Sequence, residues 1–581
     1  MKLAEALKIV QSTPSSNAEK FSVWLACGIF PLHLSTFLAA HLNRRIPERN
    51  TEIQSGVFGD LPGNLLQLKQ SNADAGAVVI EWADLDPRLG LRRLGGWGPN
   101  VLSDVLMTAG QSANQLLQLL DEAAKSVPIA VCLPTLALPP ISYQPGEQFE
   151  LNQLLLEKTL HELAASAAGI ANIKIINRHR LDAVSPSSGR LDVKSELSTG
   201  FPYTTVHASI VGELLASLIY PSPPKKGLIT DLDDTLWRGL VGEQGVDGIS
   251  WELDQRSHIH ALYQQLLRAL SDSGVLVAVA SKNDPALVAE ALARSDLILP
   301  RDSIFPVEVS WNPKSESVGK ILKAWNIGAD ATVFVDDSPL ELAEVENIYP
   351  EMECLRFLPD NEQATYALLH NLRDFFGKQE IVAEDAIRLA SLRSSGVVQS
   401  EAERDTSGSF ETFLEQLNPE LTLSTISGAG ESRAFELVNK TNQFNLNGRR
   451  LDIAQFRSAL NRRDTVSLLV SYNDKFGPLG KIAVLLGRLD STVLTIDTWV
   501  MSCRAFSRRI EHKCLEHLFE SLDVSKIEMD FQPTQRNGPM QDFLSQFINT
   551  DLTARPLIID RQHFMNTKPD LYHKINEVSY V

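Results

Sequence analysis

Short apolar runs alternate with helical patterns twice along this chain, and a proline-rich break separates the two series. The break is Y-P-S-P-P-K-K-G, from Tyr220 to Gly227, and its prolines end the helical run before it. Alternating strands and helices predict parallel sheets with helices on both faces. The predicted strands are 23–27, 77–82, 129–133 and 173–176 before the break, and 227–231, 275–281 and 331–337 after it.

After about residue 376 the pattern changes. A polar stretch rich in Glu, Arg and Ser predicts a helical connector, and beyond it a helix, successive strands and a second helix predict an α+β domain. A chain of 581 residues is also too long for one hydrophobic core. We therefore expect a multidomain α/β protein with domains at 1–222, 223–376 and 416–581, and a connector at 377–415.

Composition narrows the class of protein. With 54 basic and 72 acidic side chains the net charge is −18, which disfavours nucleic acid or an anionic membrane as the main partner. No apolar run approaches the roughly 18 residues that span a bilayer. The five cysteines are scattered and lack C-x-x-C spacing, which indicates reduced thiols and no zinc site. We expect a soluble, cytoplasmic protein.

Polar side chains lie at or just after the ends of three predicted strands of the second series. One more lies in the loop W-N-P-K-S, between the second and third of these strands. Ligand-binding groups of an open α/β sheet gather where the strands end. A carboxylate there can attack phosphorus, a second can move the proton, a hydroxyl and an ammonium can hold phosphoryl oxygens, and Mg²⁺ can join nucleophile to substrate. In chain order the residues are Asp231, Asp233, Thr235, Ser281, Lys314, Asp336 and Asp337.

Each of these features has a simpler explanation when taken alone. D-L-D-D-T could be a capped turn, Ser281 a helix cap, Lys314 a solvated loop residue, and the Asp336–Asp337 pair another turn. Their joint occurrence, in order and each near a strand end, favours a phosphate site. The intervals between the strands leave no room for a cap domain, so we expect an open site, suited to a substrate that a macromolecule presents.

This pattern resembles the haloacid dehalogenase (HAD) superfamily. The resemblance implies Asp231 as nucleophile and Asp233 as general acid/base. It implies phosphate binding by Thr235, Ser281, Lys282 and Lys314, and Mg²⁺ binding by Asp231, Asp233 (through its backbone carbonyl), Asp336 and Asp337.

Longer motifs resemble the FkbH family of glyceryltransferase/phosphatases. They are K-G-L-I-T-D-L-D-D-T-L-W-R-G-L-V-G, A-V-A-S-K-N-D, V-F-V-D-D-S-P-L-E, N-K-T-N-Q-F-N-L-N-G-R-R, D-K-F-G-P-L-G and W-V-M-S-C-R-A-F-S-R-R-I-E. The resemblance implies a phosphorylated glycerate substrate, 1,3-bisphosphoglycerate. Its three-carbon acyl unit would be loaded on an acyl carrier protein thiol for polyketide-type biosynthesis, with release of phosphate.

The C-terminal domain resembles the GNAT acyltransferase fold, although the loop Arg504–Arg509 lacks the glycines of the usual pyrophosphate loop. We expect this loop to receive a carrier protein's phosphopantetheine, with Arg504, Arg508 and Arg509 contacting its phosphate or the acidic carrier. Cys503 is a candidate acyl-enzyme thiol or a buried strand-end cysteine. The amides and hydroxyl that could orient an acyl carbonyl, or merely hold a loop, belong to Asn439, Thr441, Asn442 and Asn445.

The N-terminal domain resembles a degenerate SGNH-hydrolase fold. His207 takes the place of the catalytic base, but Thr204 stands where an aspartate is expected and no G-D-S nucleophile block is present. We therefore expect a scaffold or carrier-docking domain that does not catalyse hydrolysis. Two alternatives for the whole chain stay open: a phosphatase acting on a small phosphate ester or a phosphoprotein, and a docking protein.

Overall fold

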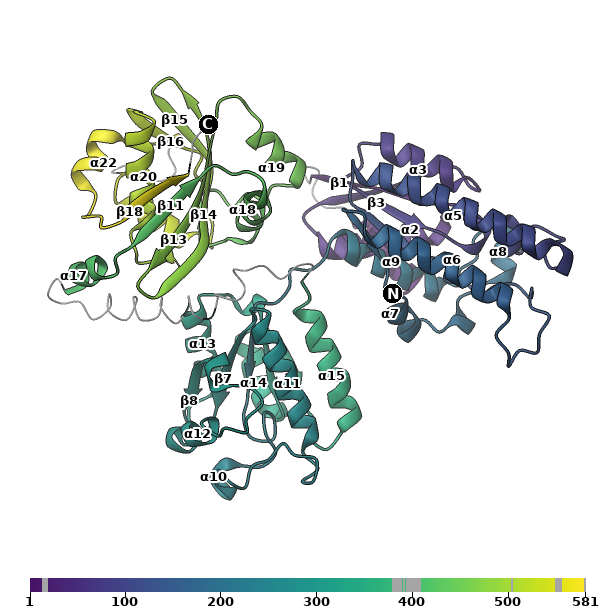
Figure 1. Cartoon of the computed structure of the whole chain (residues 1–581), viewed down its shortest axis with the longest axis horizontal. Coiled ribbons are helices and arrows are strands. Elements are labelled where there is room, and N and C mark those ends of the chain that lie inside the picture. The colour runs from purple at the N-terminus through teal and green to yellow at the C-terminus, as the bar shows by residue number, and fades with distance from the viewer. Residues whose placement is uncertain are drawn as a thin grey trace. The chain divides into compact units, whose positions relative to one another are not determined.

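Three β-sheets organise the part of the chain that the computed structural model describes, which is residues 1–12, 19–378, 389, 392, 409–502, 505–548 and 556–578 (Figure 1). The first sheet lies in a compact unit, Met1–Pro223, and the other two lie in the unit Pro224–Val581. The expectation of a multidomain α/β protein with parallel sheets is thus confirmed.

The first unit is built on a five-stranded parallel sheet of order β2-β1-β3-β4-β5. Its strands are β1 (Lys20–Cys27), β2 (Asn50–Ser55), β3 (Ala75–Val79), β4 (Ile129–Cys132) and β5 (Ile173–Ile175). Its helices are α1 (Leu3–Gln11), α2 (Leu32–Arg45), α3 (Leu61–Gln70), α4 (Trp82–Leu85), α5 (Leu102–Ala124), α6 (Leu151–Ala168), α7 (Arg178–Val184), α8 (Val193–Thr199) and α9 (Thr205–Ile219). Successive strand side chains face opposite cores, so Val23 packs with α2 and α9 whereas Ala26 packs with α3, α5 and α6.

The second sheet is also five-stranded and parallel, with order β10-β9-β6-β7-β8. Its strands are β6 (Gly227–Thr230), β7 (Leu276–Ser281), β8 (Ile304–Val309), β9 (Thr332–Asp336) and β10 (Glu353–Arg356). Its helices are α10 (Val241–Gln244), α11 (His258–Asp272), α12 (Pro285–Leu292), α13 (Lys314–Trp325), α14 (Pro339–Ile348) and α15 (Glu362–Phe375). One face packs against α11, α12 and α15, and the other against α13, α14 and the buried side chain of Leu392. The central position of β6 places the residues that follow it between those that follow β9 and β7.

The third sheet is mixed and eight-stranded. Its strands are β11 (Glu420–Ser424), β12 (Phe444–Asn445), β13 (Thr465–Asp474), β14 (Gly477–Asp490), β15 (Val493–Met501), β16 (Lys526–Met529), β17 (Leu557–Asp560) and β18 (Lys574–Val578). The helices of this part are α17 (Ser409–Gln416), α18 (Ala429–Lys440), α19 (Ile453–Leu460), α20 (Ile510–Ser521), α21 (Gly538–Ser545) and α22 (Arg561–Thr567). Helices α18 and α19 pack on one face, and α20, α21 and α22 pack on the other.

Several predicted boundaries are wrong for identifiable reasons. The strand predicted at 77–82 ends at Val79, because Glu81 is the N-cap of α4. Lys314, predicted in a loop, is the first residue of α13. The sequence does not predict the edge strands β2, β8 and β10, which are only partly buried. β2 and β10 lack a continuous apolar run. The short apolar run of β8 contains Pro306, which argues against a strand. The predicted connector lies largely outside the described residues.

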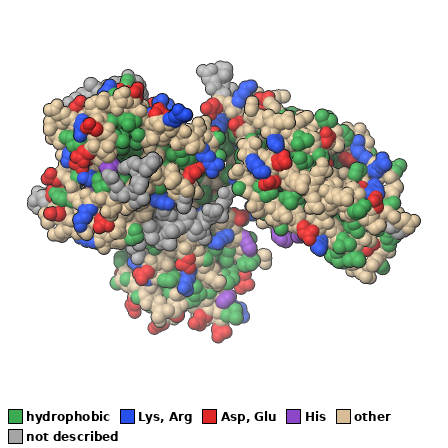
Figure 2. Space-filling view, turned by 45° about the horizontal axis from the view of Figure 1, so that its top comes forward, with side chains coloured by type: hydrophobic (Ala, Val, Ile, Leu, Met, Phe, Trp, Pro, Cys, Tyr) green, Lys and Arg blue, Asp and Glu red, His purple; other side chains and the backbone are tan. Residues whose placement is uncertain are grey.

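No helix of the described ranges is long and apolar enough to cross a membrane. On the face that Figure 2 shows, acidic and basic side chains are interspersed over the coloured parts of the surface.

Candidate active site

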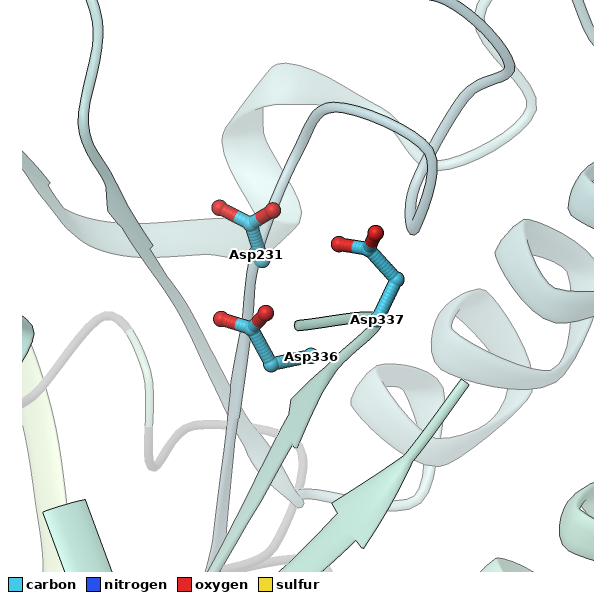
Figure 3. A group of neighbouring side chains, drawn as sticks. All are labelled: Asp231, Asp336 and Asp337. Atoms are coloured by element: carbon cyan, nitrogen blue, oxygen red, sulfur yellow. The ribbon is translucent and has the colours of Figure 1, made fainter. Parts of the chain in front are cut away.

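The adjacent strands β6 and β9 of the second sheet end at the same edge of the sheet. Acidic residues lie at or directly after both strand ends. Asp231 follows β6 directly, and its backbone N–H donates to the Val335 carbonyl at 2.9 Å. Asp336 is the last residue of β9, and Asp337 follows it. One carboxylate oxygen from each of Asp231, Asp336 and Asp337 lies within 4.8 Å of the others, and Figure 3 shows the three carboxylates gathered at this edge.

A single buried ammonium lies among these carboxylates. The Lys314 Nζ is 2.7 Å from Asp231 Oδ1 and 2.5 Å from Asp336 Oδ2, and it also pairs with Glu341. The backbone places it there: the Glu344 carboxylate accepts hydrogen bonds from the N–H groups of Lys314 and Ser315 at the start of α13. The sheet edge and the first turns of α13 and α14 therefore bring one cation and its acidic partners together.

The three clustered carboxylates outnumber the ammonium of Lys314, and burial opposes their ionisation. Desolvation raises the pKa of Asp231 to about 7, although Lys314 acts in the opposite direction. Desolvation likewise raises the pKa values of Asp336 and Asp337 to about 6. For Lys314, burial favours the neutral amine, but Asp231, Asp336 and Glu341 outweigh it and raise the pKa above its usual range. A cation placed among the carboxylates would stabilise their ionised forms.

The donor set fits Mg²⁺. Asp231, Asp336 and Asp337 offer hard carboxylate oxygens in one place, which is the ligand type that Mg²⁺ prefers, and the shortage of positive charge favours a divalent ion. The Asp233 side chain is not part of this group, because its two oxygens accept hydrogen bonds from Trp237, Val241 and Asn283. The Asp233 carboxylate is therefore engaged apart from the three clustered carboxylates, and metal binding by its backbone carbonyl stays a prediction.

The residues expected to bind phosphate differ in their burial and in the groups that they contact. Ser281 ends β7 with 2% of its surface exposed, beside the strand that leads to Asp231. Lys282 lies partly exposed, with its Nζ 3.3 Å from Glu341. Thr235 is fully buried, and its hydroxyl is 3.5 Å from an Asp337 oxygen. Thr235 therefore supports an acidic residue in this structure rather than facing open space.

The predicted amide cluster lies at the end of α18 and in the segment that leads into β12, and its polar groups bond neighbouring residues of the protein. Asn439 donates to the carbonyls of Phe435 and Leu451 and accepts from the Leu451 N–H. The Thr441 carbonyl accepts from Asn445 and Arg450, and Asn442 pairs with Arg450. These contacts favour the alternative of a hydrogen-bonded loop. Cys503 and Arg504 lie outside the described residues.

The structure corrects the expectation for Arg508. Its side chain is fully buried, and Nε lies 3.2 Å from Asp474 Oδ2, whose side chain is equally buried. Arg509 pairs with Glu411 of α17 and donates to the Asp570 carbonyl at 2.9 Å. Both arginines of the A-F-S-R-R segment thus pair with carboxylates of the protein, and the Arg508–Asp474 pair is fully buried.

In the first unit, the predicted remnant of a catalytic site is a closed polar network. His207 is fully buried, with Nε2 2.9 Å from Thr135 Oγ1 and Nδ1 2.9 Å from Ser185 Oγ. Glu81 accepts hydrogen bonds from Thr135 and from the Tyr203 hydroxyl, the latter at 2.7 Å. Burial, together with nearby arginine charges, lowers the pKa of His207 to about 3. A neutral, enclosed imidazole suits a structural role.

Sequence reasoning missed three residues of the site on the second sheet. Glu341 pairs with Lys314 and Lys282, and Trp237 and Asn283 hold Asp233. Each lies inside a motif already singled out, V-D-D-S-P-L-E, D-D-T-L-W or A-S-K-N-D. Their position within these motifs is therefore the sequence signal that could have identified them as site residues.

The fold and the site define a parallel, Rossmann-like α/β domain with an aspartate-rich site at one end of its sheet. Among solved structures, the N-terminal part of BF1531 from Bacteroides fragilis, described as containing a phosphatase domain complexed with Mg, is 19% identical. The match covers 65% of this chain and 100% of that one, with a TM-score of 0.53, and shows a shared fold. An uncharacterised Corynebacterium glutamicum protein is 18% identical over 26% of this chain and 98% of its own, with a TM-score of 0.20. No family model and no curated protein matches the chain.

Proposed function

We propose that the second-sheet domain is a magnesium-dependent phosphatase of the HAD type that forms an aspartyl-phosphate on Asp231. The observation that carries this proposal is the buried Lys314 ammonium, 2.7 Å from Asp231 and 2.5 Å from Asp336, in a carboxylate cluster at the strand ends. The structural relationship to a domain described as a phosphatase complexed with Mg supports it.

The reaction assigns a task to each side chain. An Asp231 oxygen forms a bond to phosphorus while the bond to the leaving oxygen breaks, and Asp233 gives that oxygen a proton. Water then attacks the aspartyl-phosphate and passes a proton to Asp233, which releases phosphate and restores Asp231. Ser281 and Lys314 bind phosphoryl oxygens as their charge grows. Mg²⁺ held by Asp231, Asp336 and Asp337 would offset the charge of the phosphoryl group.

A finer proposal concerns the reaction that this phosphatase serves. The long motifs shared with the FkbH family favour a glyceryltransferase/phosphatase that takes its three-carbon unit from 1,3-bisphosphoglycerate and loads it on an acyl carrier protein in the cytoplasm. The partner would be the carrier's phosphopantetheine arm, with neither nucleic acid nor a membrane involved. Domains of the SGNH and GNAT types, in this proposal, flank the phosphatase.

One experiment distinguishes the glyceryltransferase/phosphatase proposal from the simpler phosphatase proposal. The full chain is incubated with Mg²⁺, 1,3-bisphosphoglycerate and a candidate carrier protein, and the intact mass of the carrier is measured beside released phosphate. A glyceryl adduct supports the transferase. Phosphate release from simple esters, without an adduct on any carrier tested, supports a phosphatase alone.

A matched pair of variants tests the phosphatase itself. Asp231→Asn should abolish phosphate release from esters, whereas Asp360→Asn should leave it unchanged, since Asp360 is exposed and its pair with Arg238 lies at the surface. Retained phosphate release in Asp231→Asn would contradict the proposed mechanism.

A further inference from the structure

The Asp233 carboxylate is held by three donors that come from two separate segments. Its Oδ1 accepts from the Trp237 indole N–H at 2.9 Å and from the Val241 backbone N–H at 3.2 Å. Its Oδ2 accepts from the Asn283 amide at 2.9 Å. Both oxygens are therefore fixed, although the residue itself is only half-buried. Three donors on two oxygens therefore fix the orientation of the Asp233 carboxylate.

The side chain of Asn283 is itself fixed. Asn283 has 3% of its surface exposed and lies between Ser281, the end of β7, and Asp284, which caps α12 through the N–H groups of Ala286 and Leu287. Its amide nitrogen is also 3.5 Å from the Ser281 hydroxyl oxygen. As the acceptor of that contact, Ser281 keeps its own proton free to donate to a phosphoryl oxygen. One amide thus touches both the residue expected to bind phosphate and the residue expected to move the proton.

Trp237 is equally constrained. It is fully buried in the domain core, four residues after Asp233, and the turn between them brings its indole N–H back to the carboxylate. Within that turn the Asp234 carboxylate accepts from the Gly239 N–H at 2.9 Å. The donor is therefore anchored by packing and does not have to be ordered when substrate binds.

We propose that Asn283 and Trp237 are positioning residues for proton transfer by Asp233, and that they adapt the site to phosphate monoesters of aliphatic alcohols. This rests on the proposed phosphatase function. Because three donors fix the orientation of the Asp233 carboxylate, its proton can pass to the leaving alcohol oxygen without a prior movement of the side chain. An aliphatic alkoxide is a poor leaving group and needs that proton, whereas a nitrophenolate leaves without it.

The test compares two substrates in the full chain with Mg²⁺. For Asn283→Ala and Trp237→Phe, kcat/KM for glycerol 3-phosphate should fall at least about tenfold more than kcat/KM for 4-nitrophenyl phosphate, within the range that general acid catalysis contributes. This parameter reports departure of the leaving oxygen, whereas kcat also includes hydrolysis of the aspartyl-phosphate, which Asp233 assists for both substrates. A restored amide donor in Asn283→Gln should recover part of the loss for glycerol 3-phosphate.

Matched controls exclude a merely structural effect. Trp251→Phe removes an indole N–H that donates to the Asp296 carbonyl, and Gln264→Ala removes a buried amide that bonds the Leu236 carbonyl. Both should affect the two substrates equally. The inference is overturned if Asn283→Ala and Trp237→Phe also lower kcat/KM for the two substrates equally, or if the native protein does not cleave glycerol 3-phosphate. Failure of the phosphatase proposal itself would be seen separately, because Asp231→Asn would then still hydrolyse 4-nitrophenyl phosphate.

Discussion

Replacing Lys314 with methionine should destabilise the second sheet in a manner that depends on both pH and magnesium. The side chain of Lys314 is 4% exposed, and its partners Asp231 and Asp336 are 7% and 0% exposed. Removing one partner of a buried ion pair costs about 3–5 kcal/mol, because the remaining charge is left without compensation. The control, Lys320→Met, removes a pair of 3.8 Å whose lysine is 57% exposed, and should cost less than about 1 kcal/mol.

The loss should shrink as pH falls from 8 to 6. Without the ammonium, the pKa values of Asp231 and Asp336 rise further above those of the unfolded chain, beyond the values of about 7 and about 6 that burial already gives them. The folded protein then binds more protons than the unfolded chain in this window, so its stability rises as pH falls. Saturating Mg²⁺ should offset part of the loss in the same way, because it binds the folded carboxylate cluster.

Hydrogen exchange followed by mass spectrometry is the appropriate assay. Peptides that contain β6 and β9 report the opening of this sheet alone, whereas global unfolding of a multidomain chain is not two-state. Measurements in EDTA at pH 8 and pH 6, and with Mg²⁺ at pH 8, cover the three expectations. The reasoning is refuted if Lys314→Met opens no more readily than Lys320→Met in EDTA at pH 8.

Three further predictions follow from other contacts. Because burial lowers the pKa of His207 to about 3, the unfolded chain takes up a proton below about pH 6.5 that the folded protein does not. The stability of the first unit in the native protein, relative to His207→Gln, should therefore decrease as pH falls, by at most about 1.4 kcal/mol per unit, in hydrogen exchange of peptides from α9; the same pH dependence in both proteins would contradict this. Arg508→Met leaves Asp474 buried and unpaired, and should lower the urea midpoint more than Arg509→Met, whose partner is partly exposed; equal midpoints would count against the buried pair. Asp336→Asn should weaken Mg²⁺ binding at least about tenfold by calorimetry, and unchanged affinity would remove Asp336 from the metal site.

The residues that the sequence predicts well are those whose place follows from the backbone alone. Asp231, Ser281 and Asp336 each end or follow a buried parallel strand, and the carboxyl ends of such strands meet at one edge. Their proximity therefore requires only that the strands be recognised. Lys314 was also identified, although its position depends on a helix start that the apolar pattern did not reveal.

The residues that the sequence misplaces are those whose role depends on a partner distant in the chain. From the sequence, Arg508 is predicted to be a basic loop residue. In the structure it lies beside Asp474, the last residue of β13. The amide of Asn439 could orient a ligand, but it bonds the backbone of Leu451 instead. Residue type and local spacing do not distinguish a side chain that binds a ligand from one that binds its own fold.

The central claim is that Asp231 carries the phosphoryl group during turnover. The most direct measurement is acid-quenching of the full chain during cleavage of a phosphate ester with Mg²⁺, followed by peptide mass spectrometry. The account predicts a phosphoryl increment on the peptide that contains Asp231, and its loss in Asp231→Asn together with phosphate release. A phosphoryl group on another residue, or unchanged turnover by Asp231→Asn, would contradict it.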